Sequence, residues 1–172
     1  MVDISVATTL ADFHAFHSLL DEMAVWDDAE TRAQGHDTTA LLLEAYSDSA
    51  EDLLAHFTGP GATLFLAYHG GKLAGCGGFS GAGDGVAEVE KIYVRPEFRG
   101  LGMGAALLRA VMTGMSSGGY QRARLETTTF MTSAIALYGH FGFTIVAPFR
   151  PSLGNLGSMS VFMDCELGAQ DT

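Results

Sequence analysis

The chain has 172 residues, of which 48% are hydrophobic and 17% charged, and its formal net charge is −11. A chain of this length can bury a sizeable core as one domain, and its composition excludes a disordered polymer. No apolar run approaches the ~20 residues that cross a bilayer, and the acidic balance argues against nucleic-acid binding. Because Asp3 stands near the start and no basic segment precedes it, we expect no secretory signal and a cytoplasmic location.

Cysteine and histidine are sparse in this sequence. The two cysteines, Cys76 and Cys165, are far apart in strand-like stretches. We interpret them as reduced buried thiols rather than as a disulfide or a metal pair. His14 and His17 are three residues apart on a predicted helix, but no third ligand stands nearby. We therefore predict no metal site.

Charge is distributed unevenly along the chain. Residues 1–60 contain twelve acidic residues and one basic residue, Arg32. Between Glu88 and Arg124, six basic residues outnumber three acidic ones; the basic residues are Lys91, Arg95, Arg99, Arg109, Arg122 and Arg124. A basic island of this kind favours a polyanionic ligand. The acidic first third is interpreted as either a solvated surface or a surface that attracts a cationic substrate.

The first sixty residues predict one short strand followed by helices. Residues 3–7 read as a strand, and a helix with a Thr8 or Thr9 N-cap follows. Its apolar face is predicted from helical spacing and comprises Leu10, Phe13, His17, Leu20 and Met23. The polar stretch 27–39 is expected to be a loop or a broken helix. Residues 41–45 and 52–57 look helical, and the Gly-Pro-Gly run at 59–61 ends this region.

From residue 62 the pattern changes to strands. Residues 62–68 and 72–79 flank Gly70-Gly71, which is a tight hairpin signal. A glycine-rich turn at 81–85 leads to a third strand at 86–94, so these strands form an antiparallel meander. An amphipathic helix, 103–115, then ends at a glycine pair. The remaining predicted elements are strands at 122–128, 143–147 and 158–166 and a short helix at 133–140. No repeat or linker interrupts this order.

The junction between the third strand and the amphipathic helix is rich in glycine, with Gly100, Gly102 and Gly104 following Arg99. A helix N-terminus offers unpaired N–H groups and a partial positive charge, and glycines let a phosphate approach the backbone. A Walker loop would need Lys and Ser or Thr after its last glycine, and a Rossmann motif would need different glycine spacing. The junction is therefore interpreted as either a tight turn or a phosphate site of another class.

The run Arg99-x-x-Gly102-x-Gly104, after a strand ending Ile92-Tyr93-Val94, resembles the acetyl-CoA loop of the GNAT superfamily of N-acetyltransferases. Further resemblance comes from Leu125-Glu126-Thr127, Ala134-Ile135-Ala136-Leu137-Tyr138, Phe141-Gly142-Phe143, Pro148-Phe149 and Val161-Phe162-Met163. The likeness is good over residues 62–166, whereas residues 1–60 match only in element order.

The resemblance implies an α+β fold in three layers, with a mixed, mostly antiparallel sheet of six to seven strands and about four flanking helices. It implies a single N-acetyltransferase domain over residues 1–172, in which residues 1–60 supply acceptor-side helices and 62–166 form the acetyl-CoA-binding core. Acetyl-CoA would be the co-substrate, and no metal is implied.

The resemblance also places the cofactor. The strand backbone would pair with the pantetheine arm, and the loop N–H groups would bind the pyrophosphate beside an arginine. The residues implied are Ile92, Tyr93, Val94, Arg99, Gly100, Leu101, Gly102, Met103, Gly104 and Ala105. One departure is Met131, which stands where many members carry an asparagine that contacts the cofactor. Thr132 or Ser133 could supply the missing contact.

Three residues are implied in catalysis. An alkylamine has a pKa near ~10.4, so a base or a water chain must remove its proton. Glu88 is the first choice as base and Glu90 the second, with exposed strand charges as the alternative interpretation. Tyr138 matches the family's general-acid tyrosine, which would protonate the leaving thiolate; the alternative is a tyrosine that only packs.

The function that follows is acetyl transfer from acetyl-CoA to a primary amine of a small molecule or peptide, by direct attack on the thioester. Trp26, Tyr46 and Phe149 are candidates for the acceptor pocket. One alternative is a catalytically silent GNAT-fold protein that binds acyl-CoA as a sensor or interaction module. Another is a nucleotide-binding module of a different class. A homodimer paired through an exposed last strand is also expected, with no nucleic-acid or membrane partner.

Overall fold

The structure is a computed structural model that describes residues 1–37, 39–151 and 157–168. Its seven described strands form one sheet in the order β1-β2-β3-β4-β5-β7-β6. The strands are β1 (Val2–Val6), β2 (Ala62–His69), β3 (Lys72–Gly83), β4 (Val86–Val94), β5 (Arg122–Thr128), β6 (Thr144–Val146) and β7 (Ser160–Glu166). Only β4 and β5 pair in parallel, so the expectation of a mixed, mostly antiparallel sheet is confirmed.

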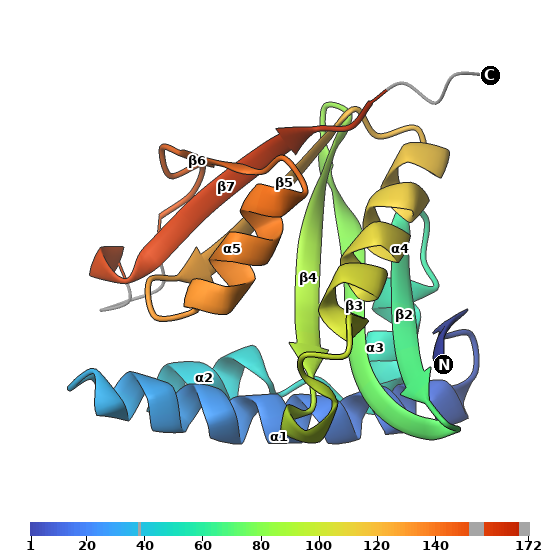
Figure 1. Ribbon diagram of the computed structural model, residues 1–172, viewed down its shortest axis with the longest axis horizontal. Coiled ribbons are helices and arrows are strands. Elements are labelled where there is room, and N and C mark those ends of the chain that lie inside the picture. Colours follow the sequence, from blue (N-terminus) through green and yellow to red (C-terminus); the bar gives the residue numbers. More distant parts are fainter. Residues whose placement is uncertain (38, 152–156, 169–172) are drawn as a thin grey trace.

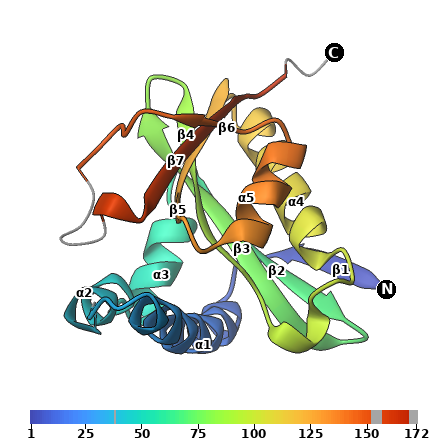
Figure 2. The ribbon, with the colours of Figure 1, turned by 60° about the vertical axis from the view of Figure 1, so that its left-hand side comes forward.

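Helices cover both faces of this sheet. They are α1 (Leu10–Ala33), α2 (Thr39–Ala45), α3 (Ala50–Phe57), α4 (Met103–Ser117) and α5 (Thr132–His140), with a 3-10 turn at Pro96–Phe98. Helices α1 to α3 lie on one side of the sheet, and α4 and α5 lie on the other (Figure 2). Each side has its own apolar core. No helix in the described part of the chain is long and apolar enough to cross a membrane.

Helix α1 begins as predicted and ends later than predicted. Thr9 is its N-cap, and a reciprocal bond between Thr9 and Asp12 completes a capping box. Of the two alternatives expected for residues 27–39, the broken helix is the one observed, because α1 continues to Ala33 and α2 begins at Thr39. Polar side chains support this extension: Arg32 pairs with Asp28 one turn earlier at 2.8 Å, and Thr31 is 97% buried. The polar composition of this stretch suggested a break at residue 27, but these side chains bond to groups in the same helix, and Thr31 is buried.

The predicted meander is confirmed. Gly70 and Gly71 both have positive φ and join His69 to Lys72 in a two-residue turn. Strand β3 continues beyond the predicted end to Gly83, because its last residues still pair with the start of β4. The connecting turn is therefore shorter than the glycine-rich run suggested.

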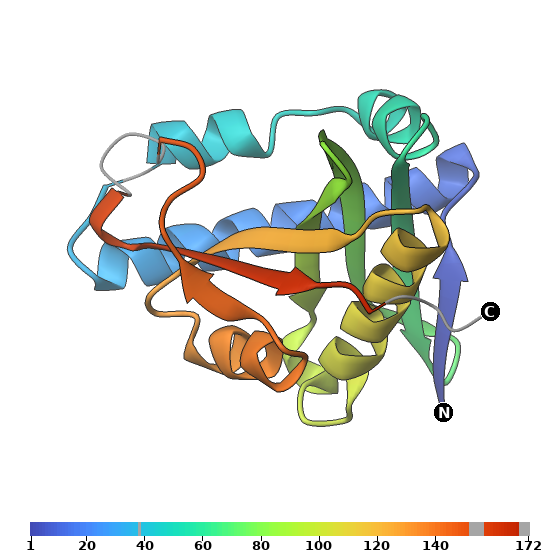
Figure 3. The same cartoon turned by 90° about the horizontal axis from the view of Figure 1, so that it is seen from above.

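Strands β4 and β5 stay together only briefly. Their parallel pairing covers Val86 to Glu88 against Arg122 to Arg124 and then stops. Just beyond, the β3–β4 register shifts, and Lys91 adopts φ +55° in a bulge of β4. The two strands diverge from this point, as Figures 1 and 3 show. The divergence leaves one backbone edge of β4 facing a gap in the sheet.

The last strand is not an edge of the sheet. Strand β7 pairs with β5 along its length and with β6 over Phe162 to Asp164. The expectation of an exposed last strand was therefore wrong: the chain between α5 and β7 folds back as β6 and covers it. The edges are β1 and β6. A homodimer stays a prediction without this structural basis.

The face of α4 that packs on the sheet contains Met103, Leu107, Leu108, Val111 and Met115, all at most 1% exposed. Replacing Leu107 with alanine should leave a cavity and destabilise the protein by about 3 kcal/mol. For a domain of this size the melting temperature should fall by about 6–12 °C. Exposed Thr113 on the same helix provides the control, and Thr113→Ala should change stability by less than about 0.5 kcal/mol. Equal melting temperatures for the two variants would contradict this packing.

Candidate active site

Two cavities open where β4 and β5 separate. The glycine-loop cavity, about 500 Å³, is bounded by the end of β4, residues 98–105 and the start of α5. The acidic cavity, about 390 Å³, is bounded by α1, α2, β4 and β5 and includes Asp27, Glu88, Glu90 and Glu126. Four residues line both cavities: Met23, Ile92, Phe130 and Met131. The two cavities therefore meet at a largely apolar neck.

The glycine loop forms the entrance to α4. Gly100 and Gly102 have φ of +77° and +80°, a left-handed conformation that favours glycine, and no atom lies within 4 Å of where a Cβ would stand. Gly102 is the N-cap and brings no capping side chain. The first helical bond runs from the Ala106 N–H to the Gly102 carbonyl at 3.0 Å. The preceding N–H groups have no acceptor within the helix, so this terminus can hold an anion.

The two arginines near the loop have different roles. Arg95 pairs with Glu22 of α1 at 2.7 Å and donates to the Leu73 carbonyl at 2.7 Å, so it ties β4 to α1 and β3. Arg99 is exposed, and the only hydrogen bond described for its side chain is from Nε to the Val94 carbonyl at 3.0 Å. Arg99 lines the glycine-loop cavity. Only Arg99 of this pair is placed to meet an anion there.

The end of β4 presents backbone to the glycine-loop cavity. Tyr93 and Val94 pair with Cys76 and Gly75 of β3, and the opposite edge of β4 faces the gap left by β5. The Tyr93 side chain is only 7% exposed and belongs to the core beneath α1. The backbone edge of Ile92 to Val94 is thus the part available to a ligand arm.

The start of α5 forms the opposite wall. Met131 is the N-cap of α5, and its N–H donates to the Thr128 carbonyl at 3.0 Å. Met131, Thr132 and Ser133 all line the glycine-loop cavity. The two hydroxyl residues therefore lie where the sequence analysis expected a substitute for the missing asparagine. Trp26 of α1 lines this cavity and does not line the acidic cavity.

Glu88 lies in the acidic cavity, but both of its oxygens are engaged. Arg124 Nε donates to Oε2 at 3.0 Å, and Arg150 Nη1 donates to Oε1. The Glu88 side chain is 15% exposed. Sequence reasoning missed this clamp because Arg150 is 62 residues away along the chain. Each oxygen keeps a second lone pair, so a base role for Glu88 would have to compete with both arginines.

Glu90 shares the strand face of Glu88 but leans toward α3. It accepts a hydrogen bond from the Ser80 hydroxyl and lies 3.6 Å from His56 Nε2. The bulge follows Glu90, so the two-residue alternation between the glutamates is intact, as predicted for an unbulged strand. Both glutamates line the acidic cavity.

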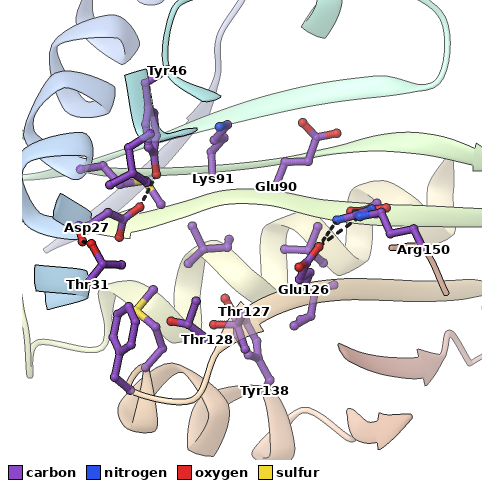
Figure 4. A pocket seen from close by; sticks show the side chains of 18 residues that line it. Asp27, Thr31, Tyr46, Glu90, Lys91, Glu126, Thr127, Thr128, Tyr138 and Arg150 are labelled. Carbon is purple, nitrogen blue, oxygen red and sulfur yellow. Dashed lines mark hydrogen bonds and ion pairs between the residues drawn. The ribbon is translucent and has the colours of Figure 1, made fainter. Parts of the chain in front are cut away.

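Arg150 and Glu126 close one end of the acidic cavity. Arg150 donates to Glu126 Oε2 from Nη2 at 2.8 Å and from Nε at 3.1 Å, and the Ser160 hydroxyl donates to Oε1 at 2.8 Å. Figure 4 shows this pair facing the cavity. The guanidinium carbons of Arg124 and Arg150 lie over the Phe149 ring, 4.3 and 5.2 Å from its centroid. Phe149 thus supports the arginines.

Tyr138 reaches the acidic cavity from α5. Its side chain is 6% exposed and packs on Phe143 with 5.9 Å between ring centroids. Burial raises the pKa of the Tyr138 phenol to about 12, so the hydroxyl carries its proton at neutral pH. In Figure 4, Tyr138 and Asp27 enter from opposite sides. The phenol can therefore act as a hydrogen-bond and proton donor.

A third group of polar residues lines the acidic cavity, and of its members only Asp27 was not singled out from the sequence. Tyr46 donates its hydroxyl hydrogen bond to Asp27 Oδ2, and Lys91 Nζ lies 4.5 Å from the Tyr46 ring centroid. Burial raises the pKa of Asp27 and lowers that of Lys91. Continuing the helical spacing from Leu20 through Met23 would have placed Asp27 on the inward face. Because residues 27–39 were expected to be a loop or a broken helix, the helical spacing was not extended to Asp27.

Potential metal ligands do not gather in this structure. Across residues 1–37, 39–151 and 157–168, no three His, Cys, Asp or Glu side chains are grouped to hold a metal ion. Cys76 is buried, and burial raises the pKa of its thiol to about 12. Cys165 is also a free thiol.

Comparison with known proteins supports the fold and the family. The sequence profile of the acetyltransferase (GNAT) family matches residues 20–143. The chain is 33% identical over 96 residues to an uncharacterized N-acetyltransferase, YjgM, of Escherichia coli K12. That match covers 54% of this chain and 58% of the relative, so the chain spans little more than half the length of this relative.

Solved structures resemble nearly the whole chain at lower identity. A GNAT-family acetyltransferase from Streptococcus pneumoniae superposes with a TM-score of 0.74 at 17% identity, covering 98% of this chain and 100% of that one. PaiA N-acetyltransferase from Thermoplasma acidophilum, solved in complex with coenzyme A, superposes with a TM-score of 0.71 at 18% identity. The match covers 95% of this chain and 99% of that one. These likenesses establish the fold. With the profile match over most of its length, the chain belongs to the GNAT family of acetyltransferases.

Proposed function

We propose that this protein transfers the acetyl group of acetyl-CoA to a primary amine of a small molecule or peptide. The observation that carries the proposal is the open N-terminus of α4, formed by two left-handed glycines, at a cavity that joins a second, acidic cavity. The first has the chemistry for a polyanion and the second for an amine. The similar PaiA structure holds coenzyme A, which supports the same ligand here.

The residues present fit acetyl-CoA. Backbone N–H groups at residues 103–105, beside Arg99, would hold the pyrophosphate, with Gly100 and Gly102 allowing close approach. The backbone edge of Ile92 to Val94, which β5 does not pair, would bind the pantetheine arm as an added strand does, beside the Arg99 contact to the Val94 carbonyl. Thr132 and Ser133 face the same space. When bound, the thioester supplies an acyl group activated toward amines.

Catalytic roles are proposed for three residues of the acidic cavity. Tyr138 would donate a proton to the leaving sulfur, since its phenol is protonated at neutral pH and lies at the cavity wall. Glu88 and Glu90 are the bases proposed from the sequence. Glu90 has the less restrictive surroundings, because Ser80 is neutral and His56 is 49% exposed, whereas two arginines hold Glu88.

One observation favours a second candidate, a protein that binds acyl-CoA without transferring the acyl group. Both oxygens of Glu88 are engaged by arginines in the described structure. This candidate shares the cofactor site and differs only in turnover. Tight acetyl-CoA binding without acetylation across a broad amine panel would support it.

Acetyl-CoA should stabilise the protein against heat. At about 100 times its dissociation constant, a ligand adds ~2.7 kcal/mol, which corresponds to a rise of roughly 5–10 °C in melting temperature here. ATP and NAD serve as controls and should give no rise. The absence of a shift with millimolar acetyl-CoA would overturn the proposed function, and a shift with ATP would favour a nucleotide-binding module.

Gly102→Glu should abolish acetyl-CoA binding, because it places a negative charge at the site proposed for pyrophosphate. The matched control is Gly119→Glu at the other end of α4, where φ is +85° and a Cβ also meets nothing within 4 Å. Both variants carry the same left-handed strain of roughly 1–2 kcal/mol. Calorimetric titration should show acetyl-CoA affinity lost only in Gly102→Glu. Wild-type affinity in that variant would refute the site.

Tyr138→Phe should lower kcat by about 10- to 100-fold and leave the acetyl-CoA dissociation constant within twofold, since only the proton donor is removed. Tyr120→Phe is the control, because the Tyr120 hydroxyl donates to the Gly61 carbonyl at 2.9 Å, outside both cavities. Steady-state rates and titration calorimetry separate the two effects. Unchanged kcat in Tyr138→Phe would exclude Tyr138 as the acid.

A further inference from the structure

The acidic cavity contains one carboxylate whose free oxygen is not accounted for by the roles above. Asp27 lines the cavity from α1, one turn beyond Met23, which also lines the neck between the two cavities. Its Oδ2 accepts the hydrogen bond from Tyr46. Within the described chain, Oδ1 accepts no hydrogen bond and is not among the buried unpaired atoms, so it is open to the cavity.

The other three carboxylates of the cavity have hydrogen-bond or ion-pair partners at both oxygens or share an arginine. Glu88 and Glu126 share the guanidinium of Arg150, and Glu90 is held by Ser80 and His56. Asp27 differs because its nearest cation, Lys91, is directed over the Tyr46 ring and toward the Ala45 carbonyl, 3.4 Å away. A carboxylate with one hydroxyl donor and one open oxygen is the site in this cavity most available to an incoming ammonium group.

We propose that Asp27, in place of Glu88 or Glu90, binds the ammonium group of the acceptor amine and accepts its proton before transfer. This inference rests on the proposed function and names the residue that receives the acceptor. The open Oδ1 pairs with the ammonium nitrogen, while Tyr46 fixes the carboxylate through Oδ2. Figure 4 shows that Asp27 and Tyr138 enter the same cavity from different helices, so a reacting nitrogen would be held between base and acid.

The proton balance of this step is complete. One proton passes from the ammonium nitrogen to Asp27 Oδ1 and then to solvent, leaving a neutral amine. The nitrogen lone pair forms the C–N bond as the C–S bond of the thioester breaks with its electron pair on sulfur. Tyr138 protonates that sulfur and recovers a proton from the nitrogen. The products are the acetylated amine, the free thiol and one proton in solution.

The environment of Asp27 suits a base better than an exposed carboxylate would. Burial raises its pKa, the Tyr46 hydrogen bond and the charge of Lys91 oppose that rise, and burial is the largest of the three effects. A raised pKa brings the carboxylate closer in basicity to the amine that it deprotonates. The titratable groups that face Asp27 are the neutral phenol of Tyr46, from the segment after α2, and the cationic Lys91, from β4.

The cavity also indicates which acceptors fit. Its two lining cations are engaged, Arg150 by two carboxylates and Lys91 over the Tyr46 ring, so neither is available to a carboxylate on the acceptor. The lining carries four carboxylates against these two cations. We expect a cationic amine without a carboxyl group. Thr128 also lines the cavity, and its buried hydroxyl oxygen has no hydrogen-bond partner in the described chain.

The test compares Asp27→Asn with Asp28→Asn, a neighbour on α1 whose carboxylate pairs with Arg32 outside the cavity. Phenethylamine and putrescine are the probe acceptors, and phenylalanine and ornithine are their carboxylated counterparts. For Asp27→Asn we expect at least ~100-fold lower kcat/KM with the amines and an unchanged acetyl-CoA dissociation constant. Asp28→Asn should behave as wild type, and the carboxylated probes should react at least ~10-fold more slowly than the amines.

Two further measurements separate catalysis from folding. In wild type, kcat/KM should fall as the pH drops below the raised pKa of Asp27, and this acid limb should be absent in Asp27→Asn. Because the folded-state pKa is raised, ionised Asp27 costs folding free energy as pH increases through that pKa. Asparagine removes this cost and keeps an oxygen for Tyr46, so the melting temperature at pH 7 should not fall.

The outcomes distinguish this inference from the proposed function. Failure of acetyl-CoA to bind wild type would overturn the proposed function. Normal acetyl-CoA binding and amine turnover, with Asp27→Asn within threefold of wild type, would overturn only the role of Asp27. If acetyl-CoA binds but none of the four probes is acetylated by wild type or raises its melting temperature in the presence of CoA, the cationic acceptor site is also overturned.

Discussion

The site depends on how few residues pair β4 with β5. Parallel pairing holds three residues of each strand and ends at Glu88 and Arg124, where the ladder gives way to a Glu–Arg ion pair at 3.0 Å. The Lys91 bulge then turns β4 away. A backbone edge inside a sheet would ordinarily be satisfied by its neighbour, so this unpaired edge is costly unless water or a ligand bonds it. Both cavities arise from that separation.

Opposite electrostatic character divides the two cavities. Helix α4 points its N-terminus and Arg99 into one, while carboxylates predominate in the other. Such an arrangement suits a polyanionic co-substrate and a cationic acceptor, because each is attracted to its own side and repelled from the other. The apolar neck, including Ile92 and Met131, keeps these charges apart. In the proposed reaction the amine and the thioester would meet at this neck.

Ion pairing holds the acidic cavity in shape. Arg150 joins Glu88 of β4 to Glu126 of β5 across the point of separation, and Phe149 supports the guanidinium from below. A hydrogen bond between Asp27 and Tyr46 joins α1 to the segment after α2 elsewhere in the cavity wall. Each link spans two elements, so the cavity walls are positioned by tertiary contacts. Removing one partner would leave a buried charge and disturb the wall as well as the chemistry.

Elements whose signals are local could be predicted from the sequence. Glycines at hairpins, the Thr9 cap, the face of α4 and the limits of β5 follow from contacts within a few residues, and the glycine loop is a short run at one helix end. The sequence also placed Tyr138 on α5 and both glutamates on one strand face. Their surroundings depend on tertiary contacts. Arg150, which pairs with Glu88, is 62 residues away along the chain, and Tyr46, which donates to Asp27, is 19 residues away. The folded chain sets such contacts because packing and charge pairing act through space, whereas periodicity records only which side of an element is buried.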